Sequence, residues 1–154
     1  MSEPIFSLIA AATALNGIVA GASLDQSIKQ LPARHQIGVA AYSAYSQASD
    51  LGNGIPWYAS IGIGAAVLTI LAAIGAPLQG ISALPVYVAA VLSIAHSLVT
   101  ARAAPTLFSQ RRYGGDEAAL AGVFNRFERL QALRAFLQAL AFVSLLWAMS
   151  TSGR

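Results

Sequence analysis

Hydrophobic residues dominate four segments of the chain, and charged residues are confined to the stretches around them. Residues 4–24 contain no charged side chain. As a helix rising about 1.5 Å per residue they would span roughly 30 Å, the thickness of the hydrocarbon core of a bilayer. Residues 51–101 also contain no Asp, Glu, Lys or Arg. Because one helix of that length would be about 76 Å long, this segment must turn back on itself.

Glycine and proline residues mark the turn within this long segment. Pro77, Gly80 and Pro85 lie in or beside residues 77–84, and such residues interrupt helices. Pro105 is expected to close the helix that follows. The pattern predicts membrane-spanning helices over about 4–26, 56–76, 85–104 and 117–149, in a single domain covering 1–154.

Two polar segments are predicted to lie outside the membrane core, at residues 25–54 and 105–116. The second is expected to be a basic loop. Within the first, residues 33–49 are expected to form a short helix behind Pro32. Its apolar face would carry Ile37, Ala41, Ala44 and Ala48, whereas Tyr42, Tyr45, Ser46 and Ser49 would lie elsewhere. Such a helix would either pack on the mouth of the bundle or lie in the membrane interface, with Tyr42 and Tyr45 in an aromatic belt.

Composition supports a membrane location for the four helices. Hydrophobic residues make up 56% of the chain and charged residues 10%, against about 25% charged residues in soluble domains. The predicted fold class is therefore all-α: an integral membrane four-helix bundle with a short extramembrane helix between its first and second helices. The absence of cysteine excludes disulfides, zinc–thiolate sites and iron–sulfur clusters.

The basic residues predict the orientation of the bundle. Of the nine Lys and Arg residues, all but Arg154 flank the side that holds the segments between helices 1 and 2 and between helices 3 and 4. Basic residues concentrate on the cytoplasmic side of membrane proteins. Both termini are therefore expected to be non-cytoplasmic, in a plasma or inner membrane.

Polar residues recur on one face of three predicted helices. They are Thr13, Asn16 and Ser23 on the first, Ser93, His96 and Thr100 on the third, and Gln131, Arg134 and Gln138, with Phe127, on the fourth. Spacings of three, four and seven residues place each set on one helix face. Because a polar face is costly in lipid, we expect a polar interior between the first, third and fourth helices.

This interior is the candidate site. The candidate catalytic residues are His96 and Arg134; the candidate ligand-binding residues are Asn16, Ser93, Thr100, Phe127, Gln131 and Gln138. Three of these have structural alternatives: Asn16 can bond a neighbouring helix, His96 can donate to a carbonyl, and Arg134 can extend to the headgroups.

No metal site and no cofactor is predicted, because the two histidines, His35 and His96, lack metal-binding spacing; a haem held by both is the alternative. The expected partners are the lipid bilayer, a hydrophobic small molecule, and either further copies of the chain in a homo-oligomer or a larger membrane complex. No nucleic acid is expected, because the Arg111–Arg112 pair fits contact with anionic lipid better.

The start of the last helix resembles a known family. The stretch from Phe124 to Arg134, FNRFERLQALR, followed by AFLQALAFV, is similar to the last helix of the DUF1772, or anthrone oxygenase-like, family. The stretch from Leu15 to Gly21, LNGIVAG, resembles its first helix, and residues 100–105 resemble the end of its third. The resemblance implies four membrane helices and oxidation of a polycyclic anthrone to a quinone by oxygen, with no metal or flavin.

Such a reaction needs an apolar slot, a base and a group that holds an oxyanion. If the resemblance extends to activity, His96 would be the base, and Arg134, with Gln138 or Asn16, would hold the oxygen. Three functions thus remain open. The first is that of a scaffold or accessory subunit, or of a binder of a hydrophobic small molecule. The second is a cofactor-independent oxygenase of an anthrone-like aromatic substrate, and the third is an oligomeric transporter or channel protomer. Whether the protein is an enzyme is not decided by its sequence.

Overall fold

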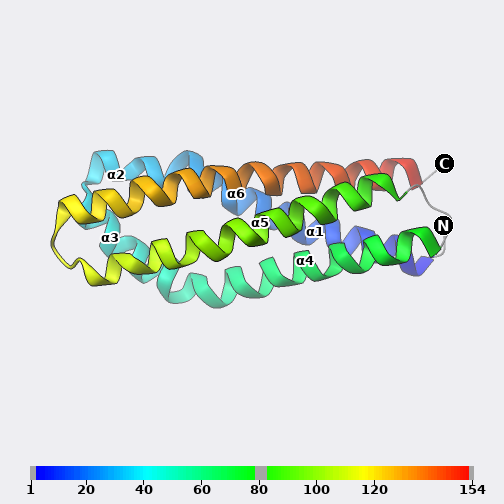
Figure 1. Cartoon of the computed structure of the whole chain (residues 1–154), viewed down its shortest axis with the longest axis horizontal. Helices are drawn as coiled ribbons and strands as arrows, with labels where there is room; N and C mark the ends of the chain where they lie inside the picture. The colour runs from blue at the N-terminus through cyan, green and yellow to red at the C-terminus, as the bar shows by residue number, and fades with distance from the viewer. Residues whose placement is uncertain (1–2, 79–82, 153–154) are drawn as a thin grey trace.

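The computed structural model describes residues 3–78 and 83–152, and within them every regular element is a helix (Figure 1). The long helices are α1 (Glu3–Asp25), α4 (Gly54–Leu78), α5 (Leu84–Phe108) and α6 (Glu117–Ser152). They form a four-helix bundle, so the predicted fold class is confirmed. Each lies in a stretch long and apolar enough to cross a membrane, which is the arrangement of a multi-pass membrane protein.

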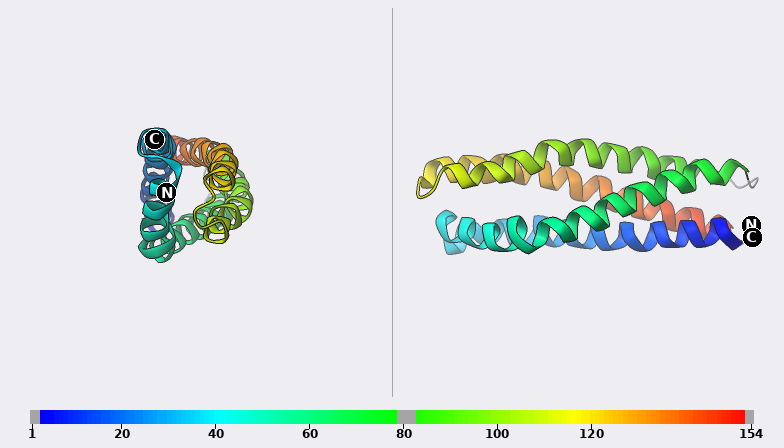
Figure 2. Two further views of the ribbon diagram at one scale, coloured as in Figure 1. Left: turned by 90° about the vertical axis from the view of Figure 1, so that its left-hand side faces the viewer. Right: turned by 90° about the horizontal axis from the view of Figure 1, so that it is seen from below.

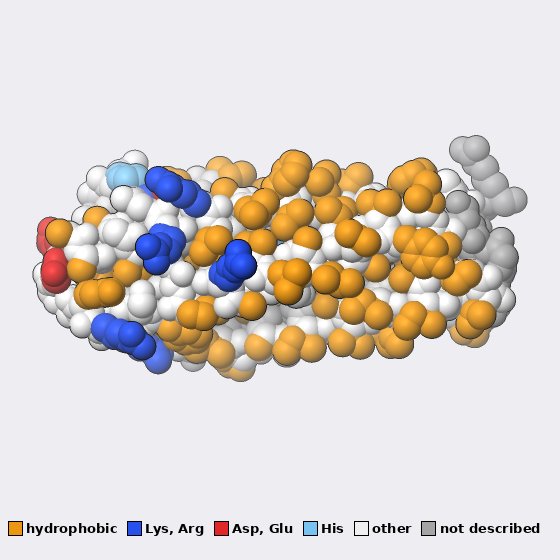
Figure 3. Space-filling model, in the orientation of Figure 1, with side chains coloured by type: hydrophobic (Ala, Val, Ile, Leu, Met, Phe, Trp, Pro, Cys, Tyr) orange, Lys and Arg blue, Asp and Glu red, His pale blue; other side chains and the backbone are white. Residues whose placement is uncertain are grey.

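The four long helices surround one bundle axis in the order α1, α4, α5, α6 (Figure 2, left). Helix α1 begins, and α6 ends, at one end of the bundle, and the short helices lie at the other (Figure 1). Charged side chains gather at the end with the short helices, whereas hydrophobic side chains cover the rest of the visible face (Figure 3). This is the distribution expected when the apolar belt faces lipid.

The connection between α1 and α4 is helical almost throughout. Helix α1 runs through a π-helical turn (Gln26–Gln30) into α2 (Leu31–Ile37), and α3 (Val39–Ala48) runs through a second π-helical turn (Ser49–Asn53) into α4. The prediction of one helix over 33–49 is wrong at Gly38, which has φ +87°. Glycine adopts this conformation without steric cost, and the chain reverses direction there.

Helix α3 buries a polar and aromatic face, whereas the residues of the predicted apolar face are exposed. Tyr42, Ser43 and Ser46 are buried, whereas Ile37, Ala41, Ala44 and Ala48 are exposed. The reason is that the bundle offers specific partners: the Tyr42 ring meets the Phe124 ring edge-on at 4.9 Å between centroids. Of the two predicted positions, α3 takes the one on the bundle mouth. The predicted aromatic belt is wrong for Tyr42, while Tyr45 is half-exposed.

Helix α5 continues past Pro105, so the prediction that this proline ends the helix is wrong. The helix reaches Phe108 and is followed by a 3₁₀ turn (Ser109–Arg112), which replaces much of the predicted basic loop. Proline removes one backbone hydrogen bond, a loss that helices in membrane bundles often tolerate. The predicted turn at 77–84 falls largely on residues 79–82, which lie outside the described residues.

Candidate functional site

A cavity of about 550 Å³ opens into the side of the bundle between α4 and α5. Its rim includes Ile63 and Val67 of α4 and Ala101 of α5, which are all exposed. The walls are mainly apolar, and all four long helices contribute to them. A cavity of this size with a few polar groups is typical of small-molecule sites. The exposed residues at this opening belong to stretches of α4 and α5 that are long and apolar enough to cross a membrane.

Small residues leave this space unfilled. Ala59, Gly62 and Ala66 on α4 and Ala101 and Ala104 on α5 line the cavity. A Cβ atom added at Gly62 would meet no atom within 4 Å. Helices α4 and α5 also share a smaller interface than α5 and α6 do. The polar stripes predicted an interior among the first, third and fourth helices only, whereas α4 also provides a wall of the cavity.

The two candidate catalytic residues lie together in this cavity. His96 and Arg134 both line it, and His96 Nδ1 lies 3.2 Å from the backbone carbonyl oxygen of Arg134. A carbonyl oxygen only accepts hydrogen bonds, so Nδ1 carries the hydrogen. In the neutral ring, Nε2 then holds the free lone pair. His96 therefore has the structural contact that the sequence offered as an alternative, and it also lies in the cavity wall.

Arg134 is partly buried, and its guanidinium group is poorly paired. Its Nη1 donates to Gln131 Oε1 at 2.8 Å. Its Nε is buried and has no hydrogen-bond partner among the described residues. The side-chain amide nitrogen of Gln131 in turn donates to the backbone oxygen of Ser23 at 3.1 Å. This bond fixes the orientation of Gln131 Oε1, the atom that accepts from Arg134. Arg134 thus lines the cavity from α6, and its Nε–H donor has no acceptor among the described residues.

The other candidate residues divide into two groups. Phe127 and Thr100 line the cavity, although the Thr100 hydroxyl donates to the backbone of His96 at 2.9 Å. Ser93, Asn16, Gln131 and Gln138 are buried but are not among the lining residues. Gln138 Nε2 donates to Asn16 Oδ1 at 2.7 Å, and Asn16 Nδ2 donates to Thr69 Oγ1 at 2.9 Å. Asn16 therefore joins neighbouring helices, as its structural alternative anticipated, and the predicted shared interior is split between the cavity and this cluster.

Asp50, Gln26 and Tyr58 also line the cavity, and the sequence analysis did not select them. Asp50 is 6% exposed and accepts a hydrogen bond from Ser46 Oγ at 2.8 Å. One signal was available: Asp50 is the last charged residue before the long uncharged segment. Its burial depends on the π-helical turn at Ser49–Asn53, which the sequence pattern does not reveal.

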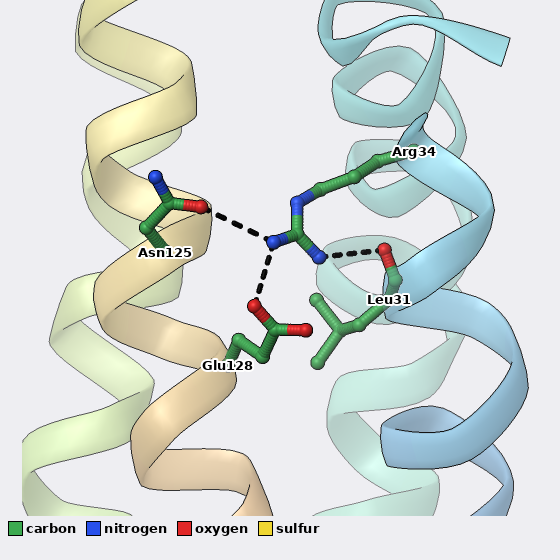
Figure 4. A network of polar contacts seen from close by, with 4 residues as sticks. All are labelled: Leu31, Arg34, Asn125 and Glu128. Atoms are coloured by element: carbon green, nitrogen blue, oxygen red, sulfur yellow. Dashed lines mark hydrogen bonds and ion pairs between the residues drawn. The ribbon is translucent and has the colours of Figure 1, made fainter. Parts of the chain in front are cut away.

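A second polar cluster joins α2 to α6 outside the cavity (Figure 4). Arg34 Nη2 donates to Glu128 Oε2 at 2.7 Å and to Asn125 Oδ1 at 3.2 Å, while Nη1 donates to the backbone oxygen of Leu31 at 2.7 Å. The Arg34 side chain is 2% exposed and that of Glu128 is 39% exposed. This buried arginine has an ion-pair partner and two further acceptors, as buried charges normally require.

Nothing in the described residues suggests a metal centre. Within residues 3–78 and 83–152, no group of three or more His, Cys, Asp or Glu side chains is placed to hold a metal ion. His35 is exposed on α2 and does not line the cavity, whereas His96 does. The structure therefore does not bring the two histidines of the haem alternative together in this cavity.

The fold and the cavity define the class of this protein: an all-α bundle of four apolar helices with a lateral cavity that carries a histidine and an arginine. No family model, no curated protein and no solved structure matches the chain.

Proposed function

We propose that this membrane protein binds an apolar small molecule in the cavity between α4 and α5. The observation that carries the proposal is the cavity itself, about 550 Å³ with mostly apolar walls and a few polar groups. Interiors of folded proteins are normally close-packed. A bundle that served only as a scaffold would gain stability if larger side chains filled this space. The lateral opening suits a ligand that dissolves in the bilayer and enters between the helices.

Binding can be tested with the purified chain in nanodiscs of neutral phosphatidylcholine. Tritiated anthracene, a neutral aromatic probe, should bind saturably above the level of empty nanodiscs. Gly62→Phe should abolish this binding, because the added ring would occupy the cavity where a Cβ meets no neighbour within 4 Å. Gly21→Phe is the matched control, since Gly21 is exposed on α1 and its Cβ position is also open. Anthracene binding that equals partitioning into empty nanodiscs, or that survives Gly62→Phe, would contradict the proposal.

A second candidate function is cofactor-independent oxygenation of an anthrone-like substrate. It is favoured by the position of His96 and Arg134 in one cavity wall and by the resemblance of the last helix to the DUF1772 family. In such a reaction, Nε2 of His96 takes a proton from the methylene carbon of the anthrone, and Arg134 stabilises the oxyanion. The carbanion adds molecular oxygen to give a peroxide anion, which takes the proton back from His96. Loss of one water molecule from this hydroperoxide gives the quinone, with molecular oxygen as the oxidant.

Oxygen consumption with anthrone as substrate tests this second function. Activity should require the wild-type chain, and His96→Leu and Arg134→Leu should each reduce it. The two effects should be less than additive, because both residues act on the same intermediate. If anthrone binds in nanodiscs while oxygen uptake stays at the uncatalysed rate, the protein is a binder and this second candidate is excluded.

We also propose that both termini are non-cytoplasmic, in a plasma or inner membrane. Support comes from the charge distribution: the basic side chains on the visible face gather at the end with α2 and α3 (Figure 3). Residues of that end include the exposed Arg111 and Arg112. An excess of Lys and Arg marks the cytoplasmic side.

A further inference from the structure

The cavity holds a partly buried cation, Arg134, whose charge no described side chain balances. We infer that the molecule bound there carries an anionic oxygen, a carboxylate, phenolate or phosphate, which pairs with the guanidinium group of Arg134. This inference rests on the proposed binding function and specifies the chemistry of the ligand.

Arg34, which is buried, and Arg134, which is partly buried, differ in their partners. Arg34 has a carboxylate, an amide oxygen and a backbone oxygen as acceptors. Arg134 has one acceptor, the amide oxygen of Gln131, and its Nε is buried without a partner among the described residues. Leaving a charge uncompensated in a low-dielectric interior is costly. The contrast indicates that the partner of Arg134 is a molecule that enters the cavity.

The other polar groups of the cavity do not supply the missing charge. Asp50 is the acidic side chain among the lining residues, but the ion pairs in the described residues are Lys29–Asp25 and Arg34–Glu128. The carboxylate of Asp50 instead accepts from Ser46. His96 donates toward the backbone of Arg134 and carries no negative charge.

The remaining walls define the rest of the ligand. Ile55, Ile63, Val67 and Ile70 of α4 and Phe127 of α6 face the same space. These side chains stabilise an apolar body and offer no hydrogen bonds. An acid with a compact hydrophobic body fits both parts of the cavity. The anionic group can belong either to such an acid dissolved in the bilayer or to the phosphate of a lipid.

A matched pair of probes tests the inference: 9-anthracenecarboxylate, which is anionic, and 9-anthracenemethanol, which is neutral and similar in shape. Each is titrated into the wild-type chain in phosphatidylcholine nanodiscs, with empty nanodiscs as the partition reference. The carboxylate should bind roughly tenfold more tightly than the alcohol, the difference expected for a charge-assisted pair in a shielded site. Arg134→Gln should remove this preference by lowering the affinity for the carboxylate to that for the alcohol. Arg129→Gln is the control, because Arg129 is exposed on the same helix.

Each outcome has a defined meaning. Equal affinity of the wild type for the two probes, or a preference that persists in Arg134→Gln, would overturn the inference while leaving the binding function intact. Saturable binding of neither probe would instead overturn the binding function itself. If Arg134→Gln does not fold, Arg134→Lys together with the wild-type pair decides the question, since the lysine should retain the preference for the anion. If phosphatidylglycerol lowers carboxylate binding beyond the fall measured in empty nanodiscs of the same lipid, the anionic group of the natural ligand belongs to a lipid phosphate. If it does not, the anionic group belongs to a small acid.

Discussion

Gln138 of α6 donates a hydrogen bond to Asn16 Oδ1 of α1 at 2.7 Å, and the two buried residues are 122 positions apart in the sequence. The side-chain amide nitrogen of Asn16 in turn donates a hydrogen bond to Thr69 Oγ1 of α4 at 2.9 Å. Three of the four long helices are thus held at one level by side-chain hydrogen bonds. In an apolar medium such bonds fix which helix faces meet, because the dispersion forces between apolar surfaces are less selective.

Replacing either residue of this pair should weaken the bundle. Asn16→Leu and Gln138→Leu should each lower the free energy of unfolding by about 1–2 kcal/mol, the upper range for hydrogen bonds between membrane helices. The double variant should lose less than the sum, since one bond is shared. Unfolding in mixed micelles of increasing dodecyl sulfate content measures the change. Gln36→Leu, at an exposed position on α2, serves as control. Fully additive losses would show that the two side chains are not coupled.

The ion pair between Arg34 and Glu128 should be asymmetric in its response to mutation. Glu128→Leu leaves a nearly buried guanidinium without its counter-ion, and we expect a loss of roughly 2–3 kcal/mol in the free energy of unfolding. Arg34→Met removes the buried charge, and the Glu128 carboxylate, whose side chain is 39% exposed, can be solvated. This loss should be about 1 kcal/mol or less.

The same unfolding measurement checks the asymmetry. Arg126→Met, an exposed neighbour on α6, should stay within about 0.5 kcal/mol of the wild type. A larger loss for Arg34→Met than for Glu128→Leu would mean that the arginine acts mainly through its packing rather than through its charge.

Much of the fold follows from the sequence pattern. The uncharged segments around α1, α4 and α5 and the apolar second half of α6 are long enough to identify four membrane helices from length and charge alone. Details of the connections were harder to predict, because they depend on tertiary partners. Gly38 breaks the helix between α2 and α3, and Pro105 does not break α5, although proline is the stronger helix breaker in isolation. Packing on neighbouring helices outweighs local preference in both places.

The candidate site was predictable in part. Periodic spacing selected His96 and Arg134, and the structure places both in one cavity wall. Spacing does not distinguish a side chain that lines a cavity from one that joins helices, and so Asn16 and Gln138 were grouped with them. The wall formed by α4 was missed because its lining residues are mostly apolar, and apolar residues are expected on any membrane helix.

Helices α1 and α6 approach closely at Gly17, and this contact should tolerate no added side chain. A Cβ atom at Gly17 would lie 2.9 Å from Cε2 of Phe142, so Gly17→Val should lower the free energy of unfolding by about 1–3 kcal/mol through overpacking. Gly21→Val, one turn further along α1 with open space around its Cβ position, is the matched control. A second substitution, Phe142→Leu, should recover part of the loss. Equal effects at Gly17 and Gly21 would show that the ring moves aside freely.

The orientation of the bundle in the membrane can be measured with single introduced cysteines, because the chain has no cysteine of its own. Leu78 is 80% exposed at the end of α4, and Gln36 is exposed on α2, at the opposite end of the bundle. If the basic end faces the cytoplasm, Leu78→Cys in intact cells should react with a membrane-impermeant maleimide. Gln36→Cys should react only after the membrane is opened, because the bilayer lies between it and the reagent. Reaction of Gln36→Cys and protection of Leu78→Cys in intact cells would reverse the orientation. Val91→Cys, 65% exposed in the first third of α5, should stay unreactive in both preparations, because lipid keeps its thiol from forming the thiolate that reacts.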